Sequence, residues 1–179
     1  GRGAPGLAAE HERGLEQRAG KPGNLLRTQD GTVTLLDFGW ARLAAGQTML
    51  TNTGQVLGTL DFLAPEQAHD ARQVDPRGDQ YSLGCSLYFL LTGRAPFAAE
   101  TPLAMLRKVV EDAPSGPSKI NPRTPPDLET ICLKCLEKRP ERRYHSAREL
   151  GEELGRFLNH QPLFAKPAAP CRRAWVWSQ

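Results

Sequence analysis

The stretch GTLDFLAPEQ, residues 58–67, decides how this chain is interpreted. It contains the triplet Ala-Pro-Glu at 64–66, follows the triplet Asp-Phe-Gly at 37–39, and precedes DQYSLG at 79–84. One such triplet occurs often by chance, and a motif match is only as good as its context. An ordered series at consistent spacing is far more specific, so these motifs are interpreted together.

Short extended segments and a long loop are predicted upstream of this stretch. Two apolar runs, at 25–28 and 32–36, flank Asp30-Gly31, a dipeptide that tolerates the positive φ angles of a hairpin turn. Residues 44–58 have no clear period and are rich in Thr, Gly and Gln. They predict a long loop, and long loops inside compact domains are usually functional.

Downstream, the pattern is helical. Residues 79–91 are apolar on nearly every side and are followed by Gly93, which predicts a buried helix with a glycine C-cap. Amphipathic helices are predicted at 101–111 and 126–137, and the pair Ser146 and Glu149 matches a capping box that opens a further helix. The apolar faces of the last two helices comprise Leu128, Ile131, Cys132, Cys135 and Leu136, and Leu150, Leu154, Phe157 and Leu158.

Composition narrows the class of protein. The chain has 179 residues, of which 39% are hydrophobic and 24% charged, as in ordinary globular proteins. A net charge of +3 does not form the basic stripe of a nucleic-acid binder, so no nucleic-acid partner is expected. No apolar run is long enough to predict a membrane segment. The four cysteines come without an export signal, so a reducing, cytoplasmic setting is predicted.

Two motifs suggest chemistry but favour ordinary structural explanations. Gly1-x-Gly3-x-x-Gly6 has the letters of a dinucleotide-binding loop, yet no strand precedes it and a proline lies within it. Cys132-x-x-Cys135 is half of a zinc motif without a second pair at workable spacing. Both of these sulfurs fall on the apolar face of a predicted helix, which favours two buried thiols.

The ordered motifs resemble the serine/threonine protein kinase family, above all its bacterial group with GT-x-x-(Tyr/Phe)-LAPEQ. The resemblance covers roughly residues 7–158, and the tail PLFAKPAAPCRRAWVW resembles the juncture after the kinase domain in large planctomycete kinases. It implies a mainly α C-terminal lobe with a small antiparallel β-hairpin, the N-terminal lobe being absent. Residues 1–158 are thus expected to form a partial kinase domain, and 159–179 a Pro-rich, then basic and aromatic linker.

The resemblance implies ATP-dependent phosphorylation of Ser/Thr in protein substrates, with Mg²⁺ as the metal. Asp37 and Asn24 match the metal ligands, and carboxylate and amide oxygens suit a hard cation. Lys21 matches the lysine that meets the γ-phosphate, where its charge would stabilise the transition state. Thr59 matches the hydroxyl that ties the substrate-binding loop to the catalytic loop.

Other matching residues are structural or regulatory. Glu66 and Arg143 match a buried ion pair that anchors the activation segment to the late helices. Asp79 matches a buried helix carboxylate that holds backbone amides of the catalytic loop. Thr51 and Thr53 lie between the Asp-Phe-Gly and Ala-Pro-Glu triplets, where relatives are phosphorylated.

The catalytic loop departs from the family. Where the family has His-Arg-Asp, this chain has Gln17-Arg18-Ala19, so Ala19 stands at the position of the catalytic base. Alanine can neither accept the proton of the substrate hydroxyl nor orient it, and such a base contributes about 10²–10⁴-fold. The glycine-rich loop and the lysine and glutamate of the N-terminal lobe are also missing from these residues, so the chain by itself is expected to be inactive.

Three interpretations stay open at this point. The first is an enzyme of the kinase family, with the altered loop as decay or as a sequence error. The second is a pseudokinase-type binding or scaffold module, which Ala19 favours. Retention of Lys21, Asn24 and Asp37 counts against it, because a module released from catalysis has no chemical need of them. The third is a non-functional gene fragment, which the absent N-terminal lobe favours.

Overall fold

The computed structural model describes residues 25–27, 33–35, 61–69 and 75–166, and this part of the chain is mainly α. The loop predicted at 44–58 lies outside the described residues.

Two short strands fall within the apolar runs from which a hairpin was predicted. Strand β1 (Leu25–Arg27) pairs antiparallel with β2 (Val33–Leu35), with Leu26 opposite Thr34. The connecting residues, Asp30 and Gly31 among them, lie outside the described residues, so the type of turn stays a prediction.

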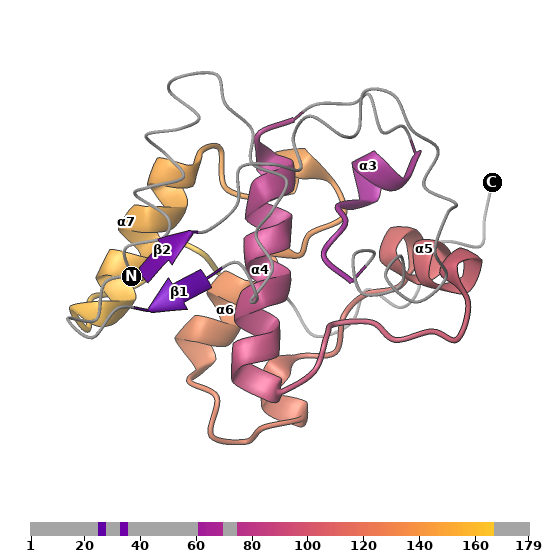
Figure 1. Ribbon diagram of the computed structural model, residues 1–179. Helices are drawn as coiled ribbons and strands as arrows, with labels where there is room; N and C mark the ends of the chain where they lie inside the picture. The colour runs from indigo at the N-terminus through magenta and orange to yellow at the C-terminus, as the bar shows by residue number, and fades with distance from the viewer. Residues whose placement is uncertain (1–24, 28–32, 36–60, 70–74, 167–179) are drawn as a thin grey trace, which may run out of the picture.

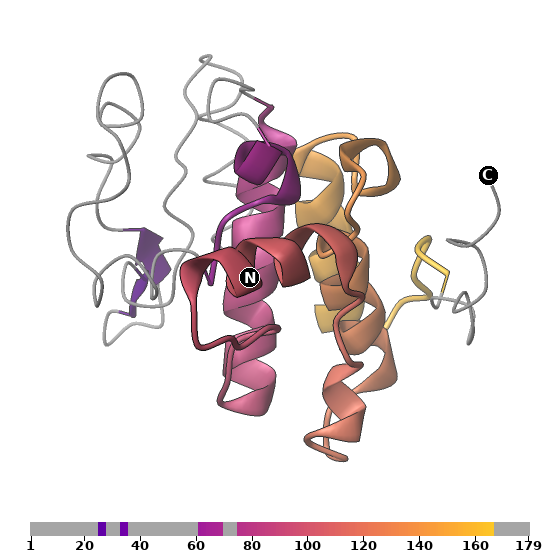
Figure 2. The ribbon, with the colours of Figure 1, turned by 90° about the vertical axis from the view of Figure 1, so that its right-hand side faces the viewer.

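Helix α4 (Arg77–Thr92) runs through the middle of the described residues. Figure 1 shows α6 and α7 on one side of it and α3 and α5 on the other, and in Figure 2 α5 crosses the direction shared by α4, α6 and α7. Direct packing joins α4 to α6, α6 to α7, and α3 to α5. The remaining bounds are α3 Pro65–His69, α5 Pro102–Glu111, η3 Pro117–Lys119, α6 Pro126–Cys135, η4 Pro140–Arg142 and α7 Ala147–Leu158.

The predicted central helix and its C-cap are confirmed. Gly93 has φ 75°, and its N–H donates to the Phe89 carbonyl at 2.7 Å, so the helix ends in the left-handed conformation that glycine adopts most easily. Burial on every side is wrong for the last turn, because Phe89 is 39% and Leu90 68% exposed. Apolar composition alone did not show where the helix emerges from the core.

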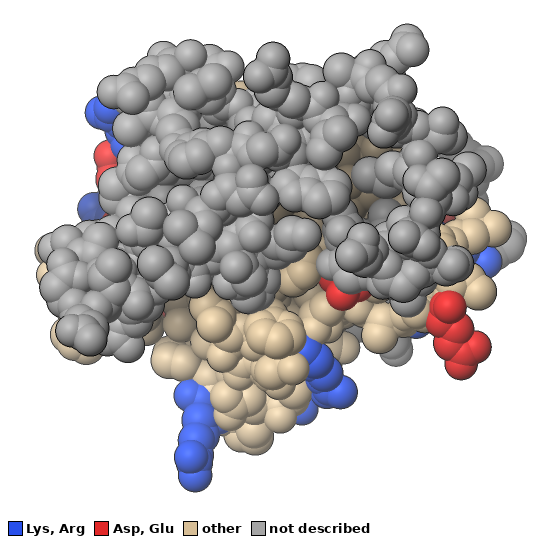
Figure 3. All heavy atoms as spheres, in the orientation of Figure 1, with Lys and Arg blue, Asp and Glu red and all other residues tan. Residues whose placement is uncertain are grey.

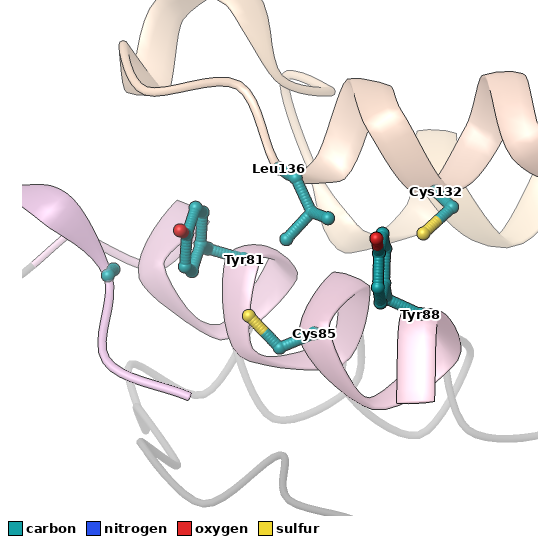
Figure 4. Close-up of a cluster of buried hydrophobic side chains, with 6 residues drawn as sticks. Tyr81, Cys85, Tyr88, Cys132 and Leu136 are labelled. Atoms are coloured by element: carbon teal, nitrogen blue, oxygen red, sulfur yellow. The ribbon is translucent and has the colours of Figure 1, made fainter. Parts of the chain in front are cut away.

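The core forms where α4 meets α6. Tyr81, Cys85 and Tyr88 of α4 are buried against Cys132 of α6 and Leu136 just after it (Figure 4). These five buried side chains, four from the two helices and Leu136 just beyond α6, thus supply a continuous apolar interface.

A glycine sets how closely α4 and α6 approach. A Cβ on Gly84 would lie 2.7 Å from the Cβ of Cys135, a separation that real side chains do not tolerate. Across the same contact the Cys132 thiol donates to the Gly84 carbonyl at 3.5 Å. Burial raises the pKa of Cys135 to about 12 and that of Cys132 further, so both thiols stay protonated. The prediction of two buried cysteines is confirmed.

Helix α7 begins as its capping signal predicts. Ser146 Oγ accepts the Glu149 N–H at 3.2 Å, while Glu149 Oε2 accepts the N–H of His145, at 2.7 Å, rather than that of Ser146. Its predicted apolar face is wrong at the C-terminal residue, Leu158, which is 59% exposed, whereas Glu153 in the middle of the helix is only 2% exposed.

The segment after α7 explains this difference. Residues 161–166 turn back onto α7, and the buried carboxylate of Glu153 accepts the N–H of Ala165 at 2.6 Å. Ala165 is buried, Leu163 packs beside it, and the Arg156 guanidinium lies 3.7 Å from the centroid of the Phe164 ring. Residues 161–166, which the sequence assigns to a linker that begins at 159, therefore pack against the last helix.

On the face that Figure 3 shows, the charged side chains of the described residues are scattered. On the face of Figure 1, Lys and Arg side chains project singly from the lower rim, with uncharged atoms between them (Figure 3). Within the described ranges, no helix is both long and apolar enough to cross a bilayer.

Replacing Glu153 with Ala should lower the free energy of unfolding by about 1.5–3 kcal/mol, because hydrogen bonds to charged groups contribute about that much. The variant leaves the buried Ala165 N–H without its acceptor and releases the returning segment. Urea denaturation measures the loss. Its exposed neighbour provides the control, since Glu152→Ala should stay within about 0.5 kcal/mol of the wild type. Equal losses in the two variants would contradict this role.

Candidate functional site

A buried arginine joins segments of the described chain that are far apart in the sequence. Arg143 follows η4, and its side chain is 0% exposed. Its Nη1 and Nη2 donate to Oε1 and Oε2 of Glu66 on α3, both at 2.7 Å, and the Glu66 side chain is only 9% exposed. This is the bidentate arrangement in which a planar guanidinium matches a carboxylate best. The structure thus brings together Glu66 and Arg143, the two residues that the sequence matched to an ion pair.

The remaining donors of Arg143 are also satisfied. Nε donates to the Glu137 carbonyl at 2.9 Å, Nη1 to the Arg77 carbonyl at 2.7 Å, and Nη2 to the Lys138 carbonyl at 3.3 Å. With the two bonds to Glu66, every N–H of the guanidinium has an acceptor. The side chain therefore fixes α3, the start of α4 and the turn after α6 relative to one another.

An aromatic ring completes this environment. The Arg143 guanidinium carbon lies 5.0 Å from the centroid of the buried Tyr81 ring, within the range of a cation–π contact. Burial raises the pKa of Tyr81 well above its ordinary value, so the ring stays neutral. Excluded from water, the Arg143–Glu66 pair is also little weakened by salt.

The segment that leads into Glu66 is held on two further sides. Ser82 Oγ of α4 donates to the Phe62 carbonyl at 2.7 Å, and Ala64 is fully buried in the core beside α4. Leu63 packs on the other side, against a buried cluster that includes Phe97. Residues 61–66 therefore have a single defined path across α4 and α5.

Most of the chemical residues predicted from the sequence lie outside the described residues. Asp79 is described and is 5% exposed in the first turn of α4, as expected of a buried helix carboxylate. The catalytic-loop residues with which it was matched lie beyond the described ranges, so its partner there stays a prediction. The predicted site residues that lie outside the described residues are Ala19, Lys21, Asn24, Asp37, Thr51, Thr53 and Thr59.

Sequence reasoning missed much of the Arg143 anchor, which is the set of hydrogen bonds from Arg143 to Glu66 and to three backbone carbonyls. The carbonyls of Arg77, Glu137 and Lys138 carry no sequence signal, because any residue offers the same backbone oxygen. The position of the Tyr81 ring beside the cation was also missed. The run KRPERR, residues 138–143, holds four basic residues, and only the match to a family motif selected the one that is buried.

Comparison with known proteins identifies the family of this chain. The model of the protein kinase domain family matches residues 4–153. A probable serine/threonine-protein kinase of Streptomyces coelicolor is 42% identical over 164 residues, covering 90% of this chain and 24% of that protein. The serine/threonine-protein kinase PknB of Mycobacterium leprae is 40% identical over 164 residues, covering 92% and 26%, and that of Mycobacterium tuberculosis is 39% identical over 165 residues, with the same coverage.

The chain belongs to the protein kinase domain family. It is similar to bacterial serine/threonine-protein kinases and spans about a quarter of the length of these relatives, 24–26%.

Removing one partner of the anchor should be strongly destabilising. Arg143→Met leaves the Glu66 carboxylate buried without its counter-charge, and we expect the free energy of unfolding to fall by about 3–5 kcal/mol in urea denaturation. The double variant Arg143→Met with Glu66→Met should lose less free energy of unfolding than the sum of the losses in the two single variants, because it leaves no uncompensated charge.

An exposed ion pair of the same chain serves as the control. Arg107 and Glu111 lie 2.9 Å apart with side chains 76% and 56% exposed, so Arg107→Met should change stability far less than Arg143→Met does, because water screens an exposed ion pair. A loss in Arg143→Met as small as that in Arg107→Met would show that the buried pair does not hold the fold.

Proposed function

We propose that residues 1–158 are the C-terminal lobe of a bacterial serine/threonine protein kinase. In the parent protein this lobe would bind protein substrates and support transfer of the ATP γ-phosphoryl group to Ser or Thr. The observation that carries the proposal is the fully satisfied Arg143 anchor, which fixes the chain at Glu66. A segment that positions a substrate needs such a fixed end, because phosphoryl transfer depends chiefly on positioning and charge neutralisation.

The residues retained before the anchor fit this chemistry. Asp37 and Asn24 would hold Mg²⁺, since carboxylate and amide oxygens are donors that this cation prefers. Mg-ATP, when bound, supplies the phosphoryl group and the metal's charge neutralisation. Lys21 would meet the γ-phosphate and stabilise the charge that develops on it. Thr59 would tie the substrate-binding loop to the catalytic loop, and Asp79 would hold that loop from α4.

The same lobe lacks one group that the reaction needs. Ala19 stands where the family has its general base, so the hydroxyl of a bound Ser or Thr would have no proton acceptor there. We therefore propose that the 179-residue chain by itself transfers no phosphate. In the parent kinase, Thr51 or Thr53 would be phosphorylated, and the cationic Arg18 would pair with the added phosphate.

A binding or scaffold role is the second candidate, and Ala19 specifically favours it. A lobe that no longer transfers phosphate could still present a rigid surface around α3 and α5 to a protein partner. Retention of Lys21, Asn24 and Asp37 favours the catalytic candidate instead, because a scaffold makes no use of a metal site.

Restoring the missing groups should restore activity. We would join the N-terminal lobe of the Streptomyces coelicolor relative to this chain and introduce Gln17→His and Ala19→Asp. This fusion should transfer labelled phosphate from Mg-ATP to a generic Ser/Thr substrate protein. The fusion that keeps Ala19 should be about 10²–10⁴-fold slower while still binding Mg-ATP.

Two controls make the result specific. Adding Asp37→Ala to the restored fusion should abolish transfer, and the 179-residue chain alone should give only background incorporation. If both fusions fold and bind nucleotide but neither transfers phosphate, the catalytic proposal fails and the scaffold candidate is favoured.

A further inference from the structure

A second cation lies in the turn that Arg143 organises. Lys138 follows α6, and its backbone carbonyl accepts from Arg143 Nη2. Its Nζ lies 4.2 Å from the centroid of the Phe97 ring and 5.9 Å from that of Tyr81, and it donates to the Val109 carbonyl. The turn after α6 thus carries two cations: Arg143 binds Glu66 of α3, and Lys138 binds the Val109 carbonyl of α5.

Lys138 meets α5 near its C-terminal end. Val109 lies in the last turn of that helix, where carbonyls lack a partner within the helix and carry the negative end of its dipole. A cation that donates to such a carbonyl favours this position of the helix end. The same ammonium group rests on the face of Phe97, which precedes α5, so it contacts both the approach to this helix and its last turn.

The buried cluster that Lys138 contacts also packs against residues 61–66, the segment that ends at Glu66. Phe97, Met105 and Val109 form a buried cluster, and Leu63 packs against it. Leu63 is three residues before Glu66 in the sequence. A contact path therefore runs from Lys138 through the cluster to Leu63, while Arg143 reaches Glu66 directly.

We propose that Lys138 is a positioning residue for residues 61–66, which it holds through α5 while Arg143 holds Glu66. The turn at 137–143 then supports this segment at two points, and the position of Leu63 depends on the ammonium group of Lys138. The claim that this placement serves a protein substrate rests on the proposed function. The structural coupling between Lys138 and Leu63 is independent of the proposed function.

The charge of Lys138 lowers global stability near neutral pH. Burial lowers its pKa from 10.5 to about 8, although the charged groups that face it have mixed effects: Asp112 after α5 and Glu137 favour the charged form, and Arg143 opposes it. Burial raises the pKa of the Cys85 thiol of α4, which therefore faces Lys138 uncharged. The neutral Tyr81 ring also faces it. Because the folded-state pKa is the lower one, folding favours the neutral amine, and stability rises as pH increases from about 8 to 10.5. Removing this charge at pH 7 should therefore not weaken the fold as a whole.

The test is amide hydrogen exchange on the full 179-residue chain carrying Lys138→Met, which keeps a side chain of similar length without the charge. At pH 7 we expect exchange in residues 61–67 and 102–112 to be faster by on the order of tenfold, as the cation–π and helix-end contacts are lost. The thermal midpoint at pH 7 should stay the same or rise. Any advantage of the variant in thermal midpoint should shrink as the pH increases from 8 to 10.5.

A second lysine provides a control that distinguishes the position of Lys138 from the loss of a positive charge as such. Lys134 lies 4.0 Å from the centroid of the Tyr144 ring and 3.8 Å from Glu149, on the side of α6 that faces α7. Lys134→Met should leave exchange in 61–67 and 102–112 unchanged.

Two results would overturn the proposal. One is wild-type exchange at 61–67 in Lys138→Met. The other is faster exchange throughout the chain together with a lower thermal midpoint, which would mean that Lys138 only stabilises the fold. Neither readout involves phosphate transfer, so this inference and the proposed function can fail separately.

Discussion

The described structure depends on one buried guanidinium. Arg143 cannot lose its proton in a folded protein, so each of its donors must find an acceptor once water is excluded. Glu66 and the carbonyls of Arg77, Glu137 and Lys138 meet that requirement together. Because these acceptors belong to different elements, their positions are set jointly, and an error in one would leave a buried charge incompletely paired.

Stability and specificity come from different parts of this fold. The apolar contact of α4 with α6, closed by Gly84, supplies burial, which is the main favourable term in folding. Buried charges add little net stability, because desolvation offsets their attraction. Their contribution is to define one arrangement: Arg143 holds the chain at Glu66. Lys138 contacts Phe97 and Val109, and the cluster that these two residues form packs against Leu63 of the same segment.

The sequence predicted those features that depend on local pattern. Periodicity and capping placed the helices, because Gly93 and Ser146 act within a few residues of the ends they define. Long-range features were harder: Glu153 is polar and was not part of the predicted apolar face, but a segment that follows α7 covers it. The anchor was found only through motif resemblance, since nothing local distinguishes Arg143 from its basic neighbours. The residues proposed to bind Mg-ATP were likewise identified only through their resemblance to family motifs.

Nitrogen-15 NMR of the arginine side chains tests the central claim most directly. A guanidinium whose donors are all bound cannot rotate freely or exchange quickly with water. Arg143 should therefore show separately resolved Nη–H signals that persist at neutral pH, and these should collapse in Glu66→Gln, where a carboxylate acceptor is lost. If every arginine in the wild-type chain, Arg143 included, gives averaged and rapidly exchanging Nη–H signals, the anchor is not formed as described and the account built on it is wrong.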